Sequence, residues 1–127
     1  MNDPLPSLGA RMTLAKEPPF RSPKLLQAAK DQACVLCEKQ DGTIVAAHYS
    51  GRYSMSVGKC WGEKSSDHVA AHLCGRCHAE MDGYAAGNDD ARAIRFFLAI
   101  FETQRRLFAR GVLKANLENY ANGKWQT

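Results

Sequence analysis

The chain has 127 residues, of which 45% are hydrophobic and 24% are charged, and its formal net charge is +4. These values are typical of a globular protein and exclude a wholly disordered chain, while the length favours one small domain with tails. No apolar run approaches the roughly 20 residues of a transmembrane helix, and the N-terminus lacks the basic start and apolar stretch of a signal peptide. We therefore expect a cytoplasmic protein with no membrane partner. The positive charge favours a polyanionic partner only weakly, because many soluble proteins carry such a charge.

The N-terminal part predicts a tail followed by a short helix. Four prolines and no apolar periodicity characterise the first twenty residues, and Ser22-Pro23 then offers a helix cap followed by a proline at the first helical position. Good helix formers follow over residues 24–30. This basic helix either covers the core or contacts nucleic acid, and its charge alone does not decide between the two. The expected organisation has three parts: a tail over residues 1–20, a folded domain over residues 21–115, and a second tail over residues 116–127, with at most one helical turn at 116–120.

Two Cys-x-x-Cys pairs are the most informative pattern in the chain: Cys34 with Cys37, and Cys74 with Cys77. Each pair can present two thiolates from one tight turn, and two such turns complete the four-sulfur shell of a structural Zn²⁺. The 36 residues between the pairs exceed the usual spacing, so a sizeable unit lies between the two turns. With Cys60 the cysteine count is odd, which fits a reducing compartment and a metal better than disulfides. A redox role would need a βαβ context that the sequence does not show.

The segment between the pairs predicts two strands joined by a polar loop. Thr43–His48 is rich in β-branched residues and follows an Asp-Gly turn, and Val69–Leu73 is a plausible returning strand. Tyr49–Asp67 is rich in serine, glycine and lysine, which predicts a flexible loop. A polar loop with three cations can receive phosphate groups, and these cations are Arg52, Lys59 and Lys64.

The second pair should open a helix over residues 74–82, with Gly83 as its stop signal. His78 and Asp82 lie four residues apart on this helix and therefore share one face. Both side chains could reach one metal ion. The alternative is that Asp82 is an exposed acid near the helix end, because such spacing is common by chance.

A long helix is predicted over residues 88–110, with Asn88-Asp89-Asp90 as its cap and first turn and Gly111 after its end. Its large apolar residues recur at helical spacing, and we expect this stripe to pack on the zinc unit: Ile94, Phe97, Leu98, Phe101 and Phe108. Its arginines either contact DNA or form an ordinary solvated face: Arg92, Arg95, Arg105, Arg106 and Arg110.

The order of these motifs resembles the HNH nucleases, whose ββα-metal site is often framed by a four-cysteine zinc. The motifs are Cys-x-x-Cys, a strand ending in Ala47-His48, the run Gly62-Glu63-Lys64-Ser65-Ser66-Asp67, a short strand, and Leu73-Cys74-x-x-Cys77-His78. Phe20-Arg21-Ser22 before the first helix narrows the resemblance to small phage and prophage nucleases related to the recombination-enhancement HNH enzymes. The resemblance implies an α+β fold, with a zinc-stabilised, treble-clef-like ββα-metal core between an N-terminal helix and a long C-terminal helix.

The resemblance also implies a function. It is that of a metal-dependent DNA endonuclease that hydrolyses phosphodiester bonds, is encoded by a phage or prophage, and takes part in DNA recombination or processing. His48 then matches the general base, Asp67 the polar middle residue and His78 the metal ligand on the helix. The catalytic ion would be Mg²⁺, Mn²⁺, Ni²⁺ or Zn²⁺, and the four cysteines would hold the structural zinc. DNA and a recombination protein are the implied partners.

Two positions depart from the family pattern. Ala47 stands where many members place an aspartate or histidine ligand. Either the ion is held by fewer protein ligands and more water, with Asp67 or Asp82 assisting, or the site is weak or inactive. Cys60 stands where related sequences tend to have glycine, and we interpret it as a free thiol. His68 and His72 match no motif residue and are interpreted as structural. The alternative function is a non-catalytic, zinc-dependent nucleic-acid-binding module descended from such a nuclease.

Overall fold

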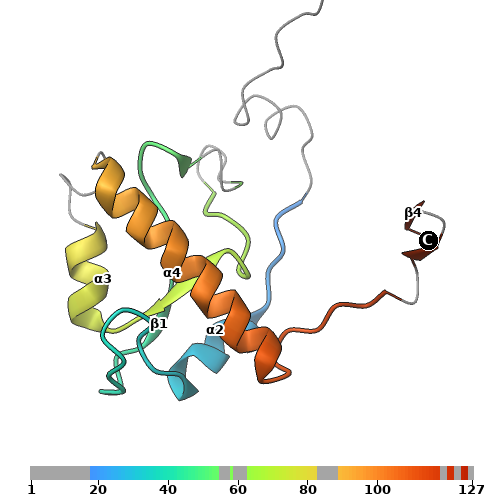
Figure 1. The fold of residues 1–127 in the computed structure, drawn as a ribbon, viewed down its shortest axis with the longest axis horizontal. Coiled ribbons are helices and arrows are strands. Elements are labelled where there is room, and N and C mark those ends of the chain that lie inside the picture. Colours follow the sequence, from blue (N-terminus) through green and yellow to red (C-terminus); the bar gives the residue numbers. More distant parts are fainter. Residues whose placement is uncertain are drawn as a thin grey trace, which may run out of the picture.

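The computed structural model describes residues 18–54, 58, 63–82, 89–117, 120–121 and 124–125. Within these residues the chain forms a small α+β fold, in which a two-stranded sheet is accompanied by the helices α2, α3 and α4 (Figure 1). The predicted fold class is confirmed at this level. No helix in the described part of the chain is both long enough and apolar enough to cross a membrane. Several predictions lie outside the described residues: most of the N-terminal tail, Lys59, Cys60, the stop at Gly83, the cap residue Asn88 and part of the C-terminal tail.

Helix α2 (Pro23–Ala28) begins where the sequence predicts, and a 3₁₀ turn, η1 (Ala29–Asp31), extends it. The Ser22 hydroxyl accepts the N–H of Leu25 at 3.1 Å, which satisfies one of the donors that a helix start leaves without a partner. Leu25 and Ala29 are buried and attach the helix to the core.

The sheet consists of β1 (Val45–His48) and β2 (Ala70–Leu73), paired antiparallel with Val45 opposite Leu73 and His48 opposite Ala70. Both strands fall within their predicted ranges. Every residue of β2 is buried, whereas β1 is only partly covered. Strand β2 therefore lies in the core of the fold, and β1 is partly exposed at the surface beside it.

Helix α3 (Gly75–Asp82) follows β2 after a single residue, so the chain runs strand, strand, helix. The N–H of Gly75 donates to Thr43 Oγ1 at 2.8 Å, and this hydroxyl donates to Asp41 Oδ1 at 2.5 Å. The first turn of α3 is thereby attached to the turn just before β1, which fixes the helix relative to the sheet.

Helix α4 (Asp90–Ala109) packs against β2 along one side (Figure 1). Asp89 caps it by accepting the N–H of Ala91 at 2.9 Å, close to the predicted start. Within the helix, Thr103 Oγ1 accepts the N–H of His72 from the outer edge of β2 at 3.0 Å and donates to the carbonyl of Ala99 at 2.8 Å. The side that packs on the sheet consists of Ala93, Phe96, Ala99, Ile100, Thr103 and Leu107.

The predicted apolar stripe of α4 is therefore on the wrong side of the helix. Phe97 is half-buried against Tyr49, but the other four residues are exposed to 59%, 60%, 65% and 51%: Ile94, Leu98, Phe101 and Phe108. The physical reason lies in the contact with β2, where Ala71 is fully buried and lets the helix approach the strand closely, while Phe96 and Ile100 fill the core beside it. A close approach of helix and strand favours the small residues Ala93, Ala99 and Thr103 on the inner side.

The C-terminal part contains one further pair of strands. Strand β3 (Tyr120–Ala121) pairs antiparallel with β4 (Lys124–Trp125). The helical turn predicted for residues 116–120 is therefore wrong at its C-terminal end, because Tyr120 lies in a strand.

Candidate functional site

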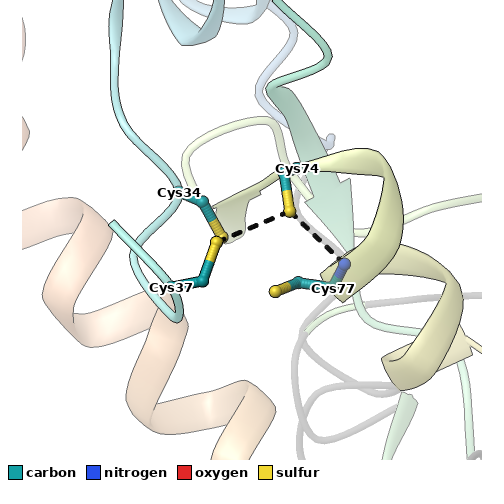
Figure 2. A group of neighbouring side chains, drawn as sticks. All are labelled: Cys34, Cys37, Cys74 and Cys77. Atoms are coloured by element: carbon teal, nitrogen blue, oxygen red, sulfur yellow. Dashed lines mark hydrogen bonds between the residues drawn. The ribbon is translucent and has the colours of Figure 1, made fainter. Parts of the chain in front are cut away.

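The four cysteines of the two predicted pairs form one cluster, although 36 residues separate the pairs in the sequence. All four sulfur atoms lie within 4.8 Å of one another, and the side chains converge from a loop, a strand end and a helix (Figure 2). The sulfur atoms of Cys37 and Cys74 are 3.7 Å apart. Four sulfurs placed tetrahedrally at about 2.3 Å from a zinc ion would be about 3.8 Å from each other. The geometry of the cluster therefore fits a structural Zn²⁺.

The first pair is held by a tight turn at the edge of β2. The N–H of Cys34 donates to the carbonyl of Lys39 at 2.9 Å, and the N–H of Val35 donates to the carbonyl of His72 at 3.0 Å. Glu38 closes the turn with a φ of 64°, a conformation that side chains other than glycine rarely adopt. Its carboxylate pairs with Arg106 of α4. The turn is thus anchored to both the sheet and the long helix.

The second pair lies at the junction of β2 and α3, where the N–H of Cys77 donates to the sulfur of Cys74 at 3.4 Å (Figure 2). Burial tends to raise the pKa of the Cys34 thiol, but backbone N–H groups outweigh this and lower it to about 7. Burial and the neighbouring thiols raise the pKa of Cys77 to about 12. Ionising one sulfur thus opposes ionising the next, and a divalent cation would remove that conflict by stabilising all four thiolates.

A second cluster surrounds Asp67, whose side chain is 2% exposed. Its Oδ1 atom lies 3.1 Å from His48 Nε2 and 3.3 Å from an Arg21 nitrogen, and its Oδ2 atom accepts the N–H of Ser22 at 2.7 Å. Burial raises the pKa of Asp67, but these three donors more than compensate and hold it below its usual value. Asp67 is therefore an ionised carboxylate that joins the end of β1 to the segment before α2.

His48 lines a groove beside this cluster. The groove has a volume of about 230 Å³, and its lining combines apolar residues with His48 and two lysines: Leu26, Lys30, Ile44, Val45, Ala46, His48 and Lys64. Burial is the main influence on His48 and lowers its pKa below 6.5; the hydrogen bond to Asp67 acts in the opposite direction, and the positive charge of Lys64 adds to the lowering. His48 is consequently a neutral imidazole at pH 7, next to two cations.

His78 and Asp82 lie on α3 as predicted, and their Nε2 and Oδ2 atoms are 3.9 Å apart. Both side chains are substantially exposed, at 36% and 53%. Among the described residues, the four cysteines are the one group of three or more candidate ligands whose donor atoms gather closely enough for a metal. His78 and Asp82 thus form a pair that no third histidine, cysteine or carboxylate joins in this part of the chain.

The predicted phosphate contacts have different surroundings. Lys64 is exposed at the groove, whereas Arg52 pairs with Asp90 at 3.1 Å and so links the loop to the start of α4. Lys59 lies outside the described residues. Of the two histidines interpreted as structural, His72 is buried in β2 with its pKa lowered to about 4 by burial, and His68 packs its ring on Phe20.

Three residues of the site were not assigned a role from the sequence. Arg21 lies in a motif that carries the resemblance, but its contact with Asp67 spans 46 positions and has no local signal. Lys30 lies at the end of the predicted basic helix, and only the folded chain places it at the groove. Thr43 could have been noticed from the Asp-Gly-Thr turn that precedes the strand.

Comparison with known proteins adds no assignment to this geometry: no protein-family model, no curated protein and no solved structure matches the chain.

Proposed function

We propose that this protein is a metal-dependent DNA endonuclease that hydrolyses phosphodiester bonds in DNA recombination or processing, as the resemblance to phage and prophage HNH nucleases implies. The observation that supports the proposal best is the position of His48. Its imidazole lines a groove with two lysines and is held by the buried carboxylate of Asp67. A neutral base beside cations is the arrangement needed to activate water next to a phosphate.

The hydrogen bond to Asp67 assigns separate roles to the two ring nitrogens of His48. A carboxylate accepts hydrogen bonds, so Nε2 carries the proton and Nδ1 keeps its lone pair. Nδ1 can then take a proton from the water that attacks the phosphorus. The imidazolium that forms is stabilised by Asp67, while Lys30 and Lys64 attract the phosphate into the groove.

The best candidates to hold a catalytic ion are His78 and Asp82, which face each other on α3. When bound, a divalent cation would stabilise the charge that develops on the phosphate and on the leaving oxygen. One nitrogen and one carboxylate leave most of the coordination shell to water, which suits Mg²⁺ or Mn²⁺ and also allows Ni²⁺ or Zn²⁺.

A non-catalytic, zinc-dependent nucleic-acid-binding module is the second candidate function. The observation that favours it is Ala47, which is 2% exposed and has no donor atom next to the proposed base. The groove, its lysines and the cysteine cluster would serve a binding module equally well.

The two functions are separated by a nicking assay on supercoiled plasmid, with and without each of the four divalent ions. Wild-type protein should nick DNA only with an added ion, and His48→Ala should slow nicking by roughly a hundred- to ten-thousand-fold while DNA binding is retained. His78→Ala should also abolish nicking and, in addition, weaken binding of the added ion. His68→Ala is the matched control, because His68 is an exposed histidine that packs on Phe20 and does not line the groove.

Zinc content must be measured for every variant, since His78 adjoins Cys77. Normal nicking by both His48→Ala and His78→Ala would overturn the assignment of the site. Absence of nicking by the wild-type protein with all four ions, on supercoiled, linear and single-stranded DNA, would favour the binding module.

A further inference from the structure

The groove beside His48 has two walls, and each wall places an apolar side chain next to a polar one. Leu26 and Lys30 are four positions apart along α2 and η1, so they lie on the same side of this helical segment. Ala46 and His48 are two positions apart in β1, so they lie on the same face of the strand. Leu26 and Ala46 are both half-buried and therefore keep surface that a ligand can contact. The groove thus offers apolar surface directly beside the groups proposed to meet the phosphate.

The positive charge of the groove is not compensated within the described part of the chain. Neither Lys30 nor Lys64 forms an ion pair with another described residue. No carboxylate is among the described residues that line the groove. Asp67 lies behind His48, and its charge is shared with Arg21. The groove therefore favours an anionic ligand, but the apolar surface beside the lysines is not needed to bind a phosphate group alone.

We propose that the groove is a subsite for one unpaired nucleotide of single-stranded DNA, with its phosphate at the two lysines and one face of its base against Leu26 and Ala46. The proposal rests on the function proposed above, in which the same groove brings a DNA phosphate to His48. A nucleotide joins an anion to a flat ring whose edges are polar and whose faces are not. Proteins commonly pack apolar or aromatic side chains on these faces. A base face is thus the part of DNA that fits the apolar surface beside the lysines.

Duplex DNA does not present that part. Neighbouring bases cover both faces of each base in a duplex, and extruding one nucleotide from the stack is costly. The groove is also small, since its volume of about 230 Å³ is below the roughly 300–1,000 Å³ of drug-sized ligand pockets. It has room for one nucleotide rather than several. Because the side chain of His48 is only 11% exposed, the phosphate must enter the groove to reach it, and an unpaired nucleotide can turn inward without breaking base pairs.

Binding of short DNA strands to the full-length, zinc-loaded protein tests the proposal by fluorescence anisotropy, without added divalent ion so that the strands stay intact. Two single strands of equal length are compared over a series of salt concentrations. One is an oligothymidine, and the other consists of abasic units that have the same phosphates but no bases. The logarithm of affinity should fall with the logarithm of salt concentration at the same slope for both, because this slope counts phosphate contacts. The oligothymidine should bind about tenfold more tightly at every salt concentration, which corresponds to about 1.4 kcal/mol.

A duplex of the same length is the third probe. Phosphate contacts contribute least at the highest salt concentration, where any contact with a base face contributes the largest share of the affinity. At that concentration the duplex should bind no more tightly than the abasic strand.

Variants of the groove should separate the base contact from the phosphate contact. Leu26→Gln removes apolar surface but keeps a good helix former, so it should remove most of the tenfold advantage and leave the salt slope unchanged. Lys64→Gln should reduce the slope by roughly 0.7 and leave the advantage in place. Leu113→Gln is the matched control, because Leu113 is also a half-buried leucine but does not line the groove, and it should change neither quantity. Circular dichroism checks that each variant is folded.

Three results would overturn the proposal. Equal affinity of the wild-type protein for the oligothymidine and the abasic strand would show that the groove binds phosphate alone, whether or not Leu26→Gln folds. An advantage that a folded Leu26→Gln variant leaves intact would place the base contact elsewhere. A duplex that binds more tightly than the oligothymidine at the highest salt concentration would show that paired DNA is the ligand.

The outcome for the base subsite is distinguishable from that for the nuclease. Metal-dependent nicking together with any of these three results would overturn the subsite and leave the endonuclease in place. A tenfold advantage without nicking would support the subsite in the binding module. Absence of binding to every strand at low salt would overturn both the subsite and the proposed role of the groove in binding DNA.

Discussion

Asp67 connects more parts of the candidate site than any other single residue described here. Its two oxygens receive the Ser22 N–H, the Arg21 guanidinium and the His48 imidazole, so a buried carboxylate joins the start of α2 to the end of β1. Arg21 in turn donates to the carbonyls of Lys64 and Ser65 at 2.7 and 2.5 Å. The orientation of His48 therefore depends on the segment before α2 as well as on its own strand.

The charges around His48 predict how its pKa responds to substitution, which can be followed by NMR titration of the imidazole. In the wild type the pKa should lie below 6.5, so the ring stays neutral until the pH falls below that value. Lys64→Gln removes a nearby positive charge and should raise the pKa, whereas Asp67→Asn removes the stabilising carboxylate and should lower it further. If His48 is the base, the acid limb of the nicking rate should move in the same directions.

Lys30→Gln is the control for this titration, because Lys64 and not Lys30 is among the main charges that act on His48. It should change the pKa less than Lys64→Gln does. Equal shifts in the two lysine variants, or a lower pKa in Lys64→Gln, would contradict the electrostatic account of the groove. Asp67→Asn must also be checked for folding, since a buried hydrogen-bond network loses its charge.

Single residues could be predicted from the sequence where their signal is local. The Cys-x-x-Cys pairs, the Ser22 cap and the His78–Asp82 spacing each depend on neighbours within four positions, and the structure brings each set together. The contact of Arg21 with Asp67 spans 46 positions, and nothing in either local sequence indicates the other partner. Long-range polar contacts of this kind need the folded chain.

Among the elements, α4 has two sides that both follow a helical repeat, and sequence analysis selected the wrong one. The exposed side carries four of the five residues of the predicted stripe, while the inner side uses alanines and a threonine between Phe96, Ile100 and Leu107. Periodicity identifies the helix but does not say which of two apolar sides faces a sheet. Which side faces the sheet depends on the space above β2, and the sequence of the helix alone carries no information about that space.

Thr103 supplies a test of how α4 is attached to the sheet. The hydroxyl is buried and accepts the N–H of His72, so Thr103→Val keeps the shape of the side chain but leaves that N–H without a partner. We expect the free energy of unfolding to fall by about 1–3 kcal/mol, measured by urea titration. Thr103→Ser keeps the hydroxyl and loses one methyl group, at a cost of about 1 kcal/mol. A serine variant less stable than the valine variant would show that packing, not the hydrogen bond, dominates here.

At the scale of the whole molecule, the cysteine cluster connects the turn before β1, the end of β2 and the start of α3. Arg106 links the same turn to α4 through Glu38. The cluster therefore joins the sheet to α3 directly and to α4 through this ion pair. The general α+β arrangement and the order of strands and helices were predictable because each element has its own sequence signal, but the way α4 covers β2 was not.

Removal of zinc should therefore unfold the central unit. Binding of a structural zinc contributes about 10–16 kcal/mol, which equals or exceeds the stability of about 5–15 kcal/mol expected for a small domain. Elemental analysis should find one tightly bound zinc, and Cys74→Ser should abolish the cooperative thermal transition. Cys60→Ser is the control, because the fifth cysteine belongs to neither pair and its replacement should leave zinc content and melting unchanged. Purified protein without zinc, or a normal melting curve for Cys74→Ser, would contradict this prediction.

The hydrogen bond from Val35 to β2 has a consequence for the metal-free chain. In the folded protein the outer edge of β2 is closed, since the His72 carbonyl accepts the Val35 N–H and the His72 N–H reaches Thr103. Val35 lies between the first two zinc ligands, so loss of the metal would free its N–H and open this edge. An open edge of a fully buried, apolar strand is a template for pairing with another chain. Chelation should therefore drive the protein into intermolecular β-sheet aggregates, and zinc would protect its solubility as well as its fold.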